Sequence, residues 1–225
     1  MRDELLRVLR EHDGNRDRSQ QVEVGPSQAG GCARQTWHEF RQTPPSNDDT
    51  SVLAALMGTA IHAEIAAAMK SPIADPWGDR YLVEVEVKAG WLKGHVDLFD
   101  TQTCEVVDWK TTTKKNMGYL GSKQQRAQVQ LYGWLLSENG YQVEKVTLVG
   151  IARDGDEGDV VEKSFAYDPE AARKALDALE AIRDQDDPPA PEKPAGVFCS
   201  RFCVFYDPQA APDSKDSCPG KSGGR

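Results

Sequence analysis

The sequence predicts an α/β fold in a single domain of 225 residues. Three observations lead to this prediction. Helix-like and strand-like segments follow one another in the order helix, three strands, helix, two strands, helix. The chain is long enough to bury a core without disulfide staples. Apolar residues make up 39% and charged residues 28%, the proportions of an ordinary globular protein.

Ten segments carry the predicted elements. In chain order they are helices at 1–20, 33–41 and 52–70, strands at 81–88, 91–99 and 105–110, a helix at 122–137, strands at 143–152 and 160–165, and a helix at 168–183. The helix at 52–70 is rich in alanine and has no interior proline. Valine recurs at every second position of strand 81–88, as in a half-buried strand. Turn-forming residues from Asp100 to Thr103 join the next two strands.

The later elements have their own boundary signals. Asn139-Gly140 ends the helix at 122–137, and Pro169 lies in the first turn of the last helix. A proline-rich linker follows. We therefore divide the single domain into an N-terminal extension (1–24), a core (32–185), the linker (186–196), a cysteine-bearing tail (197–218) and a disordered end (219–225).

The net charge of −9 argues at first against a nucleic-acid partner, because phosphates bind basic surfaces. The excess is local, however. Residues 154–192 hold 13 acidic and 4 basic residues, and the rest of the chain is balanced. Residues 109–137 contain basic residues and no acidic ones. We expect a polarised molecule, in which the basic stretch meets a phosphate backbone and the acidic segment faces away.

Other classes of protein are disfavoured by the sequence. No apolar run approaches the ~20 residues of a membrane span. The first ten residues, MRDELLRVLR, lack the apolar stretch of a signal peptide. We expect a cytoplasmic protein without membrane contact, in which thiols stay reduced. Its five cysteines then favour metal ligands or free thiols over disulfides.

Two carboxylates and a lysine form the main chemical cluster. Asp108 and Lys110 point to the same side of a strand, and Asp97 lies on the neighbouring strand of the predicted hairpin. Converging carboxylates repel unless a cation lies between them, and such ligands suit Mg²⁺ or Mn²⁺. The lysine can orient a water or offset charge on a phosphate. The cluster predicts hydrolysis of a phosphodiester, although Asp-x-Lys also occurs on solvent-exposed strands.

Three further residues support this interpretation. His62 lies four residues after Gly58 on the predicted helix at 52–70, so both share one face. Gln128 and Tyr132 have the same spacing on the helix at 122–137. Each also has a purely structural explanation: a lone helical histidine can be a core residue, and the Gln/Tyr pair can serve core packing and capping.

The cysteines suggest a second site. Cys32 lies early in the chain, and Cys199, Cys203 and Cys218 lie after the linker. Four thiolates fit either a [4Fe–4S] cluster or a tetrahedral zinc ion, which would clamp the two ends of the chain together. Cys104 lies apart and is expected to be a core residue or a bystander.

The ordered set of motifs resembles the PD-(D/E)XK nuclease superfamily, and more narrowly the RecB-like exonucleases. The motifs are His62, Gly94-His95-Val96-Asp97, Asp108-Trp109-Lys110 and Gln128-x3-Tyr132. With its cysteines, the chain is similar to the iron–sulfur branch that includes the AddB nuclease domain, the CRISPR-associated exonucleases of the Cas-four type and phage-encoded members of about this length. The resemblance runs from Cys32 to Cys218. Each motif alone is weak, but their order and spacing are specific.

The resemblance implies a restriction-endonuclease-like core, a mixed β-sheet flanked by helices, with a cysteine-bound metal cluster joining the N- and C-terminal segments. The cluster would be [4Fe–4S], held by Cys32, Cys199, Cys203 and Cys218. The late cysteines are spaced x3 and x14, more widely than the CxxC pair usual in the family. Zinc therefore stays an alternative to iron–sulfur.

The resemblance also implies roles for the nuclease residues. Mg²⁺ or Mn²⁺ would be bound by His62, Asp97, Asp108 and the carbonyl of Trp109. Lys110 would orient the attacking water. Gln128 and Tyr132 would position Lys110 or the DNA strand.

The implied function is a metal-dependent DNA exonuclease in recombination, repair or phage DNA processing. Its substrate would be DNA that is single-stranded or has free ends, and recombination or replication proteins would be its partners. Two alternatives remain open. One is a non-catalytic DNA-binding or scaffold subunit with the same fold, and the other is a zinc-stapled protein whose late cysteines only hold the tail.

Overall fold

The computed structural model describes residues 4–5, 7–9, 11, 23–47, 50, 53–193 and 195–221. Of the helix predicted at 1–20, residues 4–5, 7–9 and 11 are helical, and the others lie outside the described residues. Residues 222–225 of the predicted disordered end also lie outside them. None of the described helices is long and apolar enough to cross a lipid bilayer.

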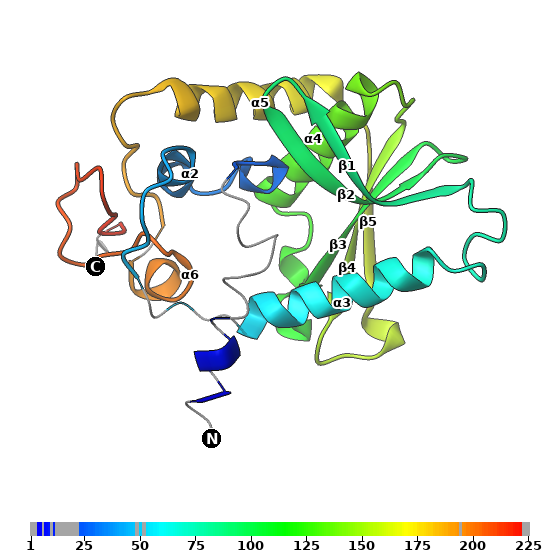
Figure 1. The fold of residues 1–225 in the computed structure, drawn as a ribbon, viewed down its shortest axis with the longest axis horizontal. Coiled ribbons are helices and arrows are strands. Elements are labelled where there is room, and N and C mark those ends of the chain that lie inside the picture. Colours follow the sequence, from blue (N-terminus) through cyan, green and yellow to red (C-terminus); the bar gives the residue numbers. More distant parts are fainter. Residues whose placement is uncertain are drawn as a thin grey trace. The chain divides into compact units, whose positions relative to one another are not determined.

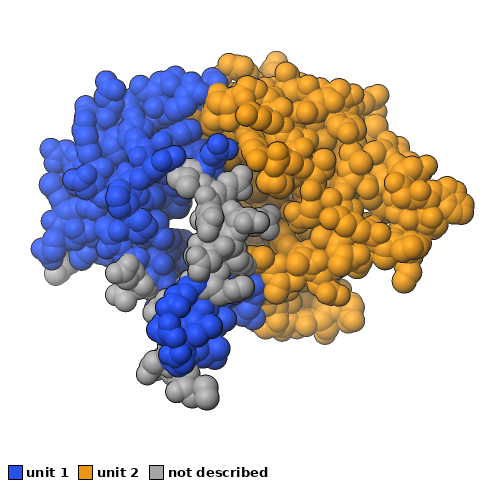
Figure 2. Space-filling model, in the orientation of Figure 1, with its two compact units in different colours: residues 1–24, 31–57, 180–225 blue, residues 25–30, 58–179 orange. Residues whose placement is uncertain are grey.

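The chain divides into two compact units (Figure 2). Unit 1 comprises residues 1–24, 31–57 and 180–225. Unit 2 comprises residues 25–30 and 58–179. That the whole chain folds as a single domain stays a prediction.

Unit 2 is built on a mixed five-stranded sheet with the order β1-β2-β3-β4-β5 (Figure 1). The strands are β1 (Tyr81–Ala89), β2 (Leu92–Asp100), β3 (Glu105–Thr112), β4 (Lys145–Ala152) and β5 (Val161–Ala166). Neighbours are antiparallel except β3 and β4, which run parallel. Helix α4 (Lys123–Glu138) connects these two, because parallel neighbours need a long crossover connection. The predicted α/β class and the order of helices and strands are confirmed.

The sheet is flanked by α4 and by most of α3 (Leu53–Met69) and α5 (Pro169–Asp184). Helix α4 begins at the cap residue Ser122, whose hydroxyl accepts the N–H of Gln125. It ends at Asn139, and the following Gly140 has φ +88°, a left-handed conformation that glycine adopts without strain. Both ends agree with the sequence prediction, since capping chemistry is local.

The core of unit 2 is formed by α4 and the strands that it contacts, β1 to β4. Its fully buried side chains alternate along the central strands, and those of α4 recur at helical spacing. They include Val96, Val106, Val146, Leu148, Val129, Leu131, Leu135 and Leu136. This core holds β2 and β3 rigidly side by side, and these strands carry the two predicted catalytic carboxylates.

Two predicted strand boundaries are wrong by two residues each. Strand β4 begins at Lys145 rather than residue 143, because its pairing with β3 starts at Glu105↔Lys145; the N–H of the preceding Glu144 donates to the carbonyl of Cys104, just before β3. Strand β3 continues beyond Lys110 to Thr112, because its pairing with β4 extends as far as Thr112↔Ala152. The longer β3 places Lys110 inside a paired strand rather than at its end.

Unit 1 joins α2 (Ala33–Phe40) to the last part of the chain, which contains the short helices η4 (Ala195–Cys199) and α6 (Ser200–Phe202). The fully buried Arg34 is the main connection. Its guanidinium donates hydrogen bonds of 2.6–3.2 Å to the carbonyls of Pro189, Pro212, Ser214 and Ser217. Early and late segments are thus joined within unit 1 by hydrogen bonds to backbone carbonyls.

Candidate active site

All the predicted nuclease residues lie in unit 2, on four elements. They are His62 on α3, Asp97 on β2, Asp108, Trp109 and Lys110 on β3, and Gln128 and Tyr132 on α4. Leu98 pairs with Val107, so the adjacent Asp97 and Asp108 also face each other across the two strands. This register agrees with the predicted convergence, although the group of potential ligand atoms within 4.8 Å of one another consists of His62, Glu84 and Asp97 and does not include Asp108.

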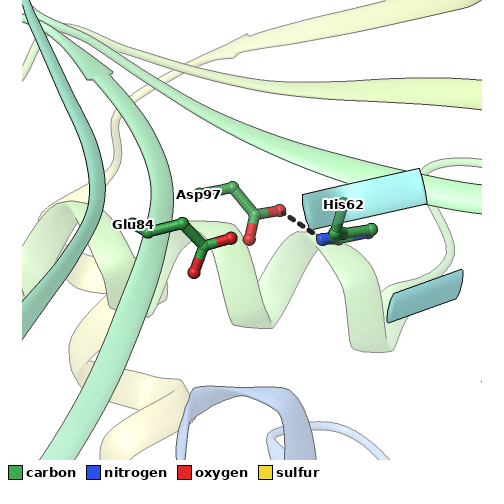
Figure 3. Close-up of side chains that lie close together, drawn as sticks. All are labelled: His62, Glu84 and Asp97. Atoms are coloured by element: carbon green, nitrogen blue, oxygen red, sulfur yellow. Dashed lines mark ion pairs between the residues drawn. The ribbon is translucent and has the colours of Figure 1, made fainter. Parts of the chain in front are cut away.

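Asp97 is 3% exposed and is held from two directions. Its Oδ2 accepts the backbone N–H of Trp109 at 2.8 Å. The same oxygen lies 3.5 Å from Nδ1 of His62 (Figure 3). These contacts fix the carboxylate between the sheet and α3.

Lys110 is held between a carboxylate and an amide. Its Nζ lies 2.8 Å from Oδ2 of Asp108 and donates to Oε1 of Gln128, also at 2.8 Å. The amide nitrogen of Gln128 donates to Oδ1 of Asp108 at 3.3 Å and to the Tyr132 hydroxyl at 3.2 Å. Gln128 therefore contacts all three other members of this network. The i, i+4 spacing of Gln128 and Tyr132 places both side chains on one face of α4, where they can contact each other.

The charge of Asp108 is unfavourable in this setting. Burial raises the pKa of Asp108 to about 6, and the charge of Asp97 adds to the rise, whereas the charge of Lys110 opposes it. A bound cation would favour the ionised form of both carboxylates. Carboxylate oxygens are the ligands that Mg²⁺ and Mn²⁺ prefer, and Mn²⁺, the softer of the two, also accepts an imidazole nitrogen, so the residues present fit a divalent cation.

Glu84 on β1 is a member of the site that the sequence prediction missed. Ligand atoms of His62, Glu84 and Asp97 all lie within 4.8 Å of one another, and Figure 3 shows the three side chains converging. Val83 pairs with Leu98 and Val85 with Val96, so Glu84 lies directly opposite Asp97.

The sequence prediction missed Glu84 because the alternating pattern of its strand treats it as one of several polar residues that face solvent. A signal was present in the sequence: a tight turn near Gly90 between strands 81–88 and 91–99 sets a register that brings Glu84 opposite Asp97. Glu84 has φ +54°, which the alternation could not indicate.

Two glycines allow close approaches beside the site. A Cβ on Gly94 would lie 2.9 Å from Cε1 of Tyr132 and 3.0 Å from Cγ of Pro26. A Cβ on Gly58 would lie 3.2 Å from Oγ1 of Thr111, where α3 approaches β3. Gly94 thus lets Tyr132 pack against β2, and Gly58 lets the helix that carries His62 come close to β3.

The predicted separation of charge is incomplete. Lys114, within the basic stretch, pairs with Asp159 at 2.6 Å, and its backbone N–H donates to Asp154. Both acids belong to the segment that was expected to face away. The other basic residues that follow Lys110 are exposed, namely Lys115, Lys123 and Arg126.

The four predicted cluster cysteines all lie in unit 1 and are free thiols. Cys199, Cys203 and Cys218 are buried, and Cys32 is half-buried at the start of α2. Burial raises the pKa of Cys199 to about 11 and that of Cys203 to about 12, and the charge of Cys32 adds to both rises. Among the described residues, no three cysteine sulfurs lie within 4.8 Å of one another, so they form no closed tetrahedral site.

The chain resembles solved structures in its fold. It is similar to the protein of the "Crystal structure of SSO0001", with 20% identity, a TM-score of 0.53, and coverage of 91% of this chain and 94% of that one. It is also similar to an alkaline exonuclease (LHK-Exo) from Laribacter hongkongensis, with 9% identity, a TM-score of 0.49 and coverage of 72% and 86%. A third similar structure is a phage related exonuclease from Haemophilus somnus 129PT, with 13% identity, a TM-score of 0.43, and coverage of 67% of this chain and 77% of that one.

No curated protein matches the chain. A family model does match, over residues 8–207, and it describes the PD-(D/E)XK nuclease superfamily. This match spans most of the chain, including every residue of the site in unit 2. The chain therefore belongs to the PD-(D/E)XK nuclease superfamily.

Proposed function

We propose that the protein is a divalent-metal-dependent DNA exonuclease of the RecB-like type. The observation that carries the proposal is the juxtaposition of Asp97 and Asp108 on neighbouring strands, with Lys110 2.8 Å from the Asp108 carboxylate. Family membership gives the reaction class, and these three residues give the means to perform it.

The cation would be held by His62, Asp97, Asp108 and the carbonyl of Trp109. When bound, Mg²⁺ or Mn²⁺ supplies a Lewis acid for the phosphate and lowers the pKa of a bound water. The protein's contribution is to fix the ligands beforehand. The hydrogen bond from the Trp109 N–H holds the Asp97 carboxylate in place, so binding costs little reorganisation.

Lys110 would orient the attacking water and offset charge that develops on the phosphate. Its ammonium is directed by two acceptors, the carboxylate of Asp108 and the amide oxygen of Gln128. The Tyr132 hydroxyl accepts a hydrogen bond from the amide nitrogen of Gln128. This contact orients the amide so that its oxygen faces Lys110. Gln128 and Tyr132 therefore act as positioning residues.

The DNA strand would follow the exposed side chains from the end of β3 into the first turn of α4. Lys115, Lys123 and Arg126 are exposed in this segment. Tyr119, which is 76% exposed, lies among them in the sequence. Basic side chains together with an exposed aromatic ring suit single-stranded DNA or a frayed end, because the ring can stack on a base. Recombination or replication proteins would supply such ends.

The four cysteines would hold a [4Fe–4S] cluster, which would place the protein in the iron–sulfur branch of the family. Zn–S bonds of about 2.3 Å require tetrahedral thiolates about 3.8 Å apart. A cubane cluster, whose ligands bind four separate iron atoms, spaces its thiolates more widely. Bound metal would also replace the protons that the buried thiols otherwise retain.

The test is cleavage of DNA labelled at the 5′ or 3′ end, single- or double-stranded, with Mg²⁺ or Mn²⁺. The wild type should release labelled mononucleotides or short products, and Asp108→Ala should lose at least a hundredfold in rate. Asp177→Ala, an exposed carboxylate on α5, is the matched control and should cleave normally. Tight DNA binding without cleavage by the wild type would overturn the proposal in favour of a scaffold subunit.

The cluster has a separate test. Protein purified without oxygen should absorb near 400 nm and contain iron, and Cys199→Ala should lose the absorbance. Cys104→Ala is the control, because Cys104 belongs to unit 2 and the other four cysteines belong to unit 1. This variant should keep the absorbance. A colourless wild type with stoichiometric zinc would refute the cluster.

A further inference from the structure

We propose that the carboxylate of Glu84 is a ligand of the divalent cation, together with His62 and Asp97. The inference rests on the proposed function and adds a residue that the family motifs did not assign. Glu84 comes from β1, so the cation would be held by α3 and three successive strands of the sheet rather than by α3, β2 and β3 alone.

The distances allow one cation to contact all three side chains. Their ligand atoms lie within 4.8 Å of one another. Ligands on opposite sides of a single Mg²⁺ are about 4.2 Å apart, and adjacent ones about 3 Å, since each bond is about 2.1 Å. Shifts of about an ångström in these side chains would complete the coordination. Figure 3 shows the carboxylates of Glu84 and Asp97 turned toward the same space beside the His62 ring.

The charge around Glu84 also favours a cation. Glu84 lies directly opposite the buried Asp97, and like charges at such positions repel. Among the described residues, no lysine or arginine is ion-paired with Glu84. Two residues further along the strand, Glu86 has Lys93 at 2.8 Å and His95 at 3.3 Å. Glu86 is thus neutralised by the protein, whereas two adjacent carboxylates at Glu84 and Asp97 match the charge of one divalent ion.

The chemical consequence concerns the order of events. With Glu84 and Asp97 both ionised, these two carboxylates balance the charge of the cation, and Asp108 joins them as a ligand that also contacts Lys110 and Gln128. Glu84 would then add to the affinity for the cation, and Lys110 would serve the reacting phosphate. Loss of the Glu84 charge should weaken metal binding more than it alters the geometry around Lys110.

The experiment is a titration of metal-stripped full-length protein with Mn²⁺, following free Mn²⁺ by electron paramagnetic resonance. We expect Glu84→Gln to raise the Kd for Mn²⁺ tenfold or more. Glu86→Gln is the matched control, because it makes the same chemical change on the same strand, and its Kd should stay within about twofold of the wild type. Asp97→Asn should weaken binding at least as much as Glu84→Gln.

A thermal-unfolding series gives a second readout that needs no activity. Saturating Mn²⁺ should raise the Tm of the wild type and of Glu86→Gln but not that of Glu84→Gln, because only a cation bound to the native state stabilises it. If Glu84→Gln fails to fold, Glu84→Asp keeps the charge on a shorter side chain and should show an intermediate Kd.

The outcomes separate the two proposals. If Asp97→Asn loses Mn²⁺ and Glu84→Gln binds it like the wild type, the role of Glu84 is refuted and the metal-dependent function stands. If the wild type itself binds no Mn²⁺ or Mg²⁺, both are overturned.

Discussion

Acid should destabilise unit 1 through His38, a residue outside the proposed active site. Its imidazole is fully buried, stacked on Phe205 at 5.0 Å between ring centroids and edge-on to Trp37 at 5.1 Å. Burial lowers the pKa of His38 to about 4, and the charges of Arg34 and Arg41 lower it further, against a small opposing effect of Asp216. The ring is therefore neutral in the native state across the physiological range.

The sign and size of the effect follow from the two pKa values. In the unfolded chain His38 titrates near 6.5, so below that pH the unfolded state binds a proton that the native state excludes. The stability contributed by neutral His38 is present above pH 6.5 and is lost as the pH falls toward 4. The full difference in free energy of unfolding is about 3.4 kcal/mol, of which about 2.5 kcal/mol is lost at pH 4.5.

The assay is urea unfolding of the wild type and of His38→Gln at pH 7.5 and 4.5. Carboxylates titrate equally in both proteins, so the difference between their pH dependences isolates His38. The wild type should lose about 2.5 kcal/mol more than the variant between the two pH values. An NMR titration that found the His38 pKa at 6 or above, or equal losses in the two proteins, would refute the reasoning.

Three further predictions concern unit 2. Gly94→Ala should destabilise the protein by about 1–3 kcal/mol in urea unfolding, because its Cβ would overlap the Tyr132 ring; an unchanged midpoint would show that the ring moves freely. Glu84→Gly should raise the Tm of metal-free protein by a few degrees, since glycine removes about 1 kcal/mol of strain at φ +54° and the repulsion beside it; a lowered Tm would contradict this. Gln128→Ala should reduce kcat for DNA cleavage about 10–100-fold with little change in KM, because Lys110 loses the amide that directs it; equal kcat values would remove Gln128 from the mechanism.

The elements of unit 2 could be predicted from the sequence because their signals are local. The Ser122 cap and Gly140 delimit α4, and alternating valines mark β1. The facing of Asp97 and Asp108 was also predictable, because a short turn between two strands fixes their register within a few residues of chain. The family resemblance implied that His62 joins this pair, and its Nδ1 lies 3.5 Å from Oδ2 of Asp97.

The tertiary structure decided what depends on contacts between distant segments. The parallel pairing of β3 with β4 follows from the crossover through α4. This pairing extends β3 beyond Lys110 to Thr112. The pairing of Lys114 with Asp159, 45 residues later, makes the expected separation of charge incomplete.

The sequence by itself therefore determined the order of the elements, the family and most of the chemical groups at the site, because these depend on local patterns and short spacings. Only the folded chain decided how those groups are held. Gln128 contacts Lys110 across 18 residues, and Glu84 turns toward Asp97 through a left-handed backbone that no side-chain pattern encodes. Such contacts are set by the packing of whole elements against one another, and packing is a property of the complete core rather than of any one segment.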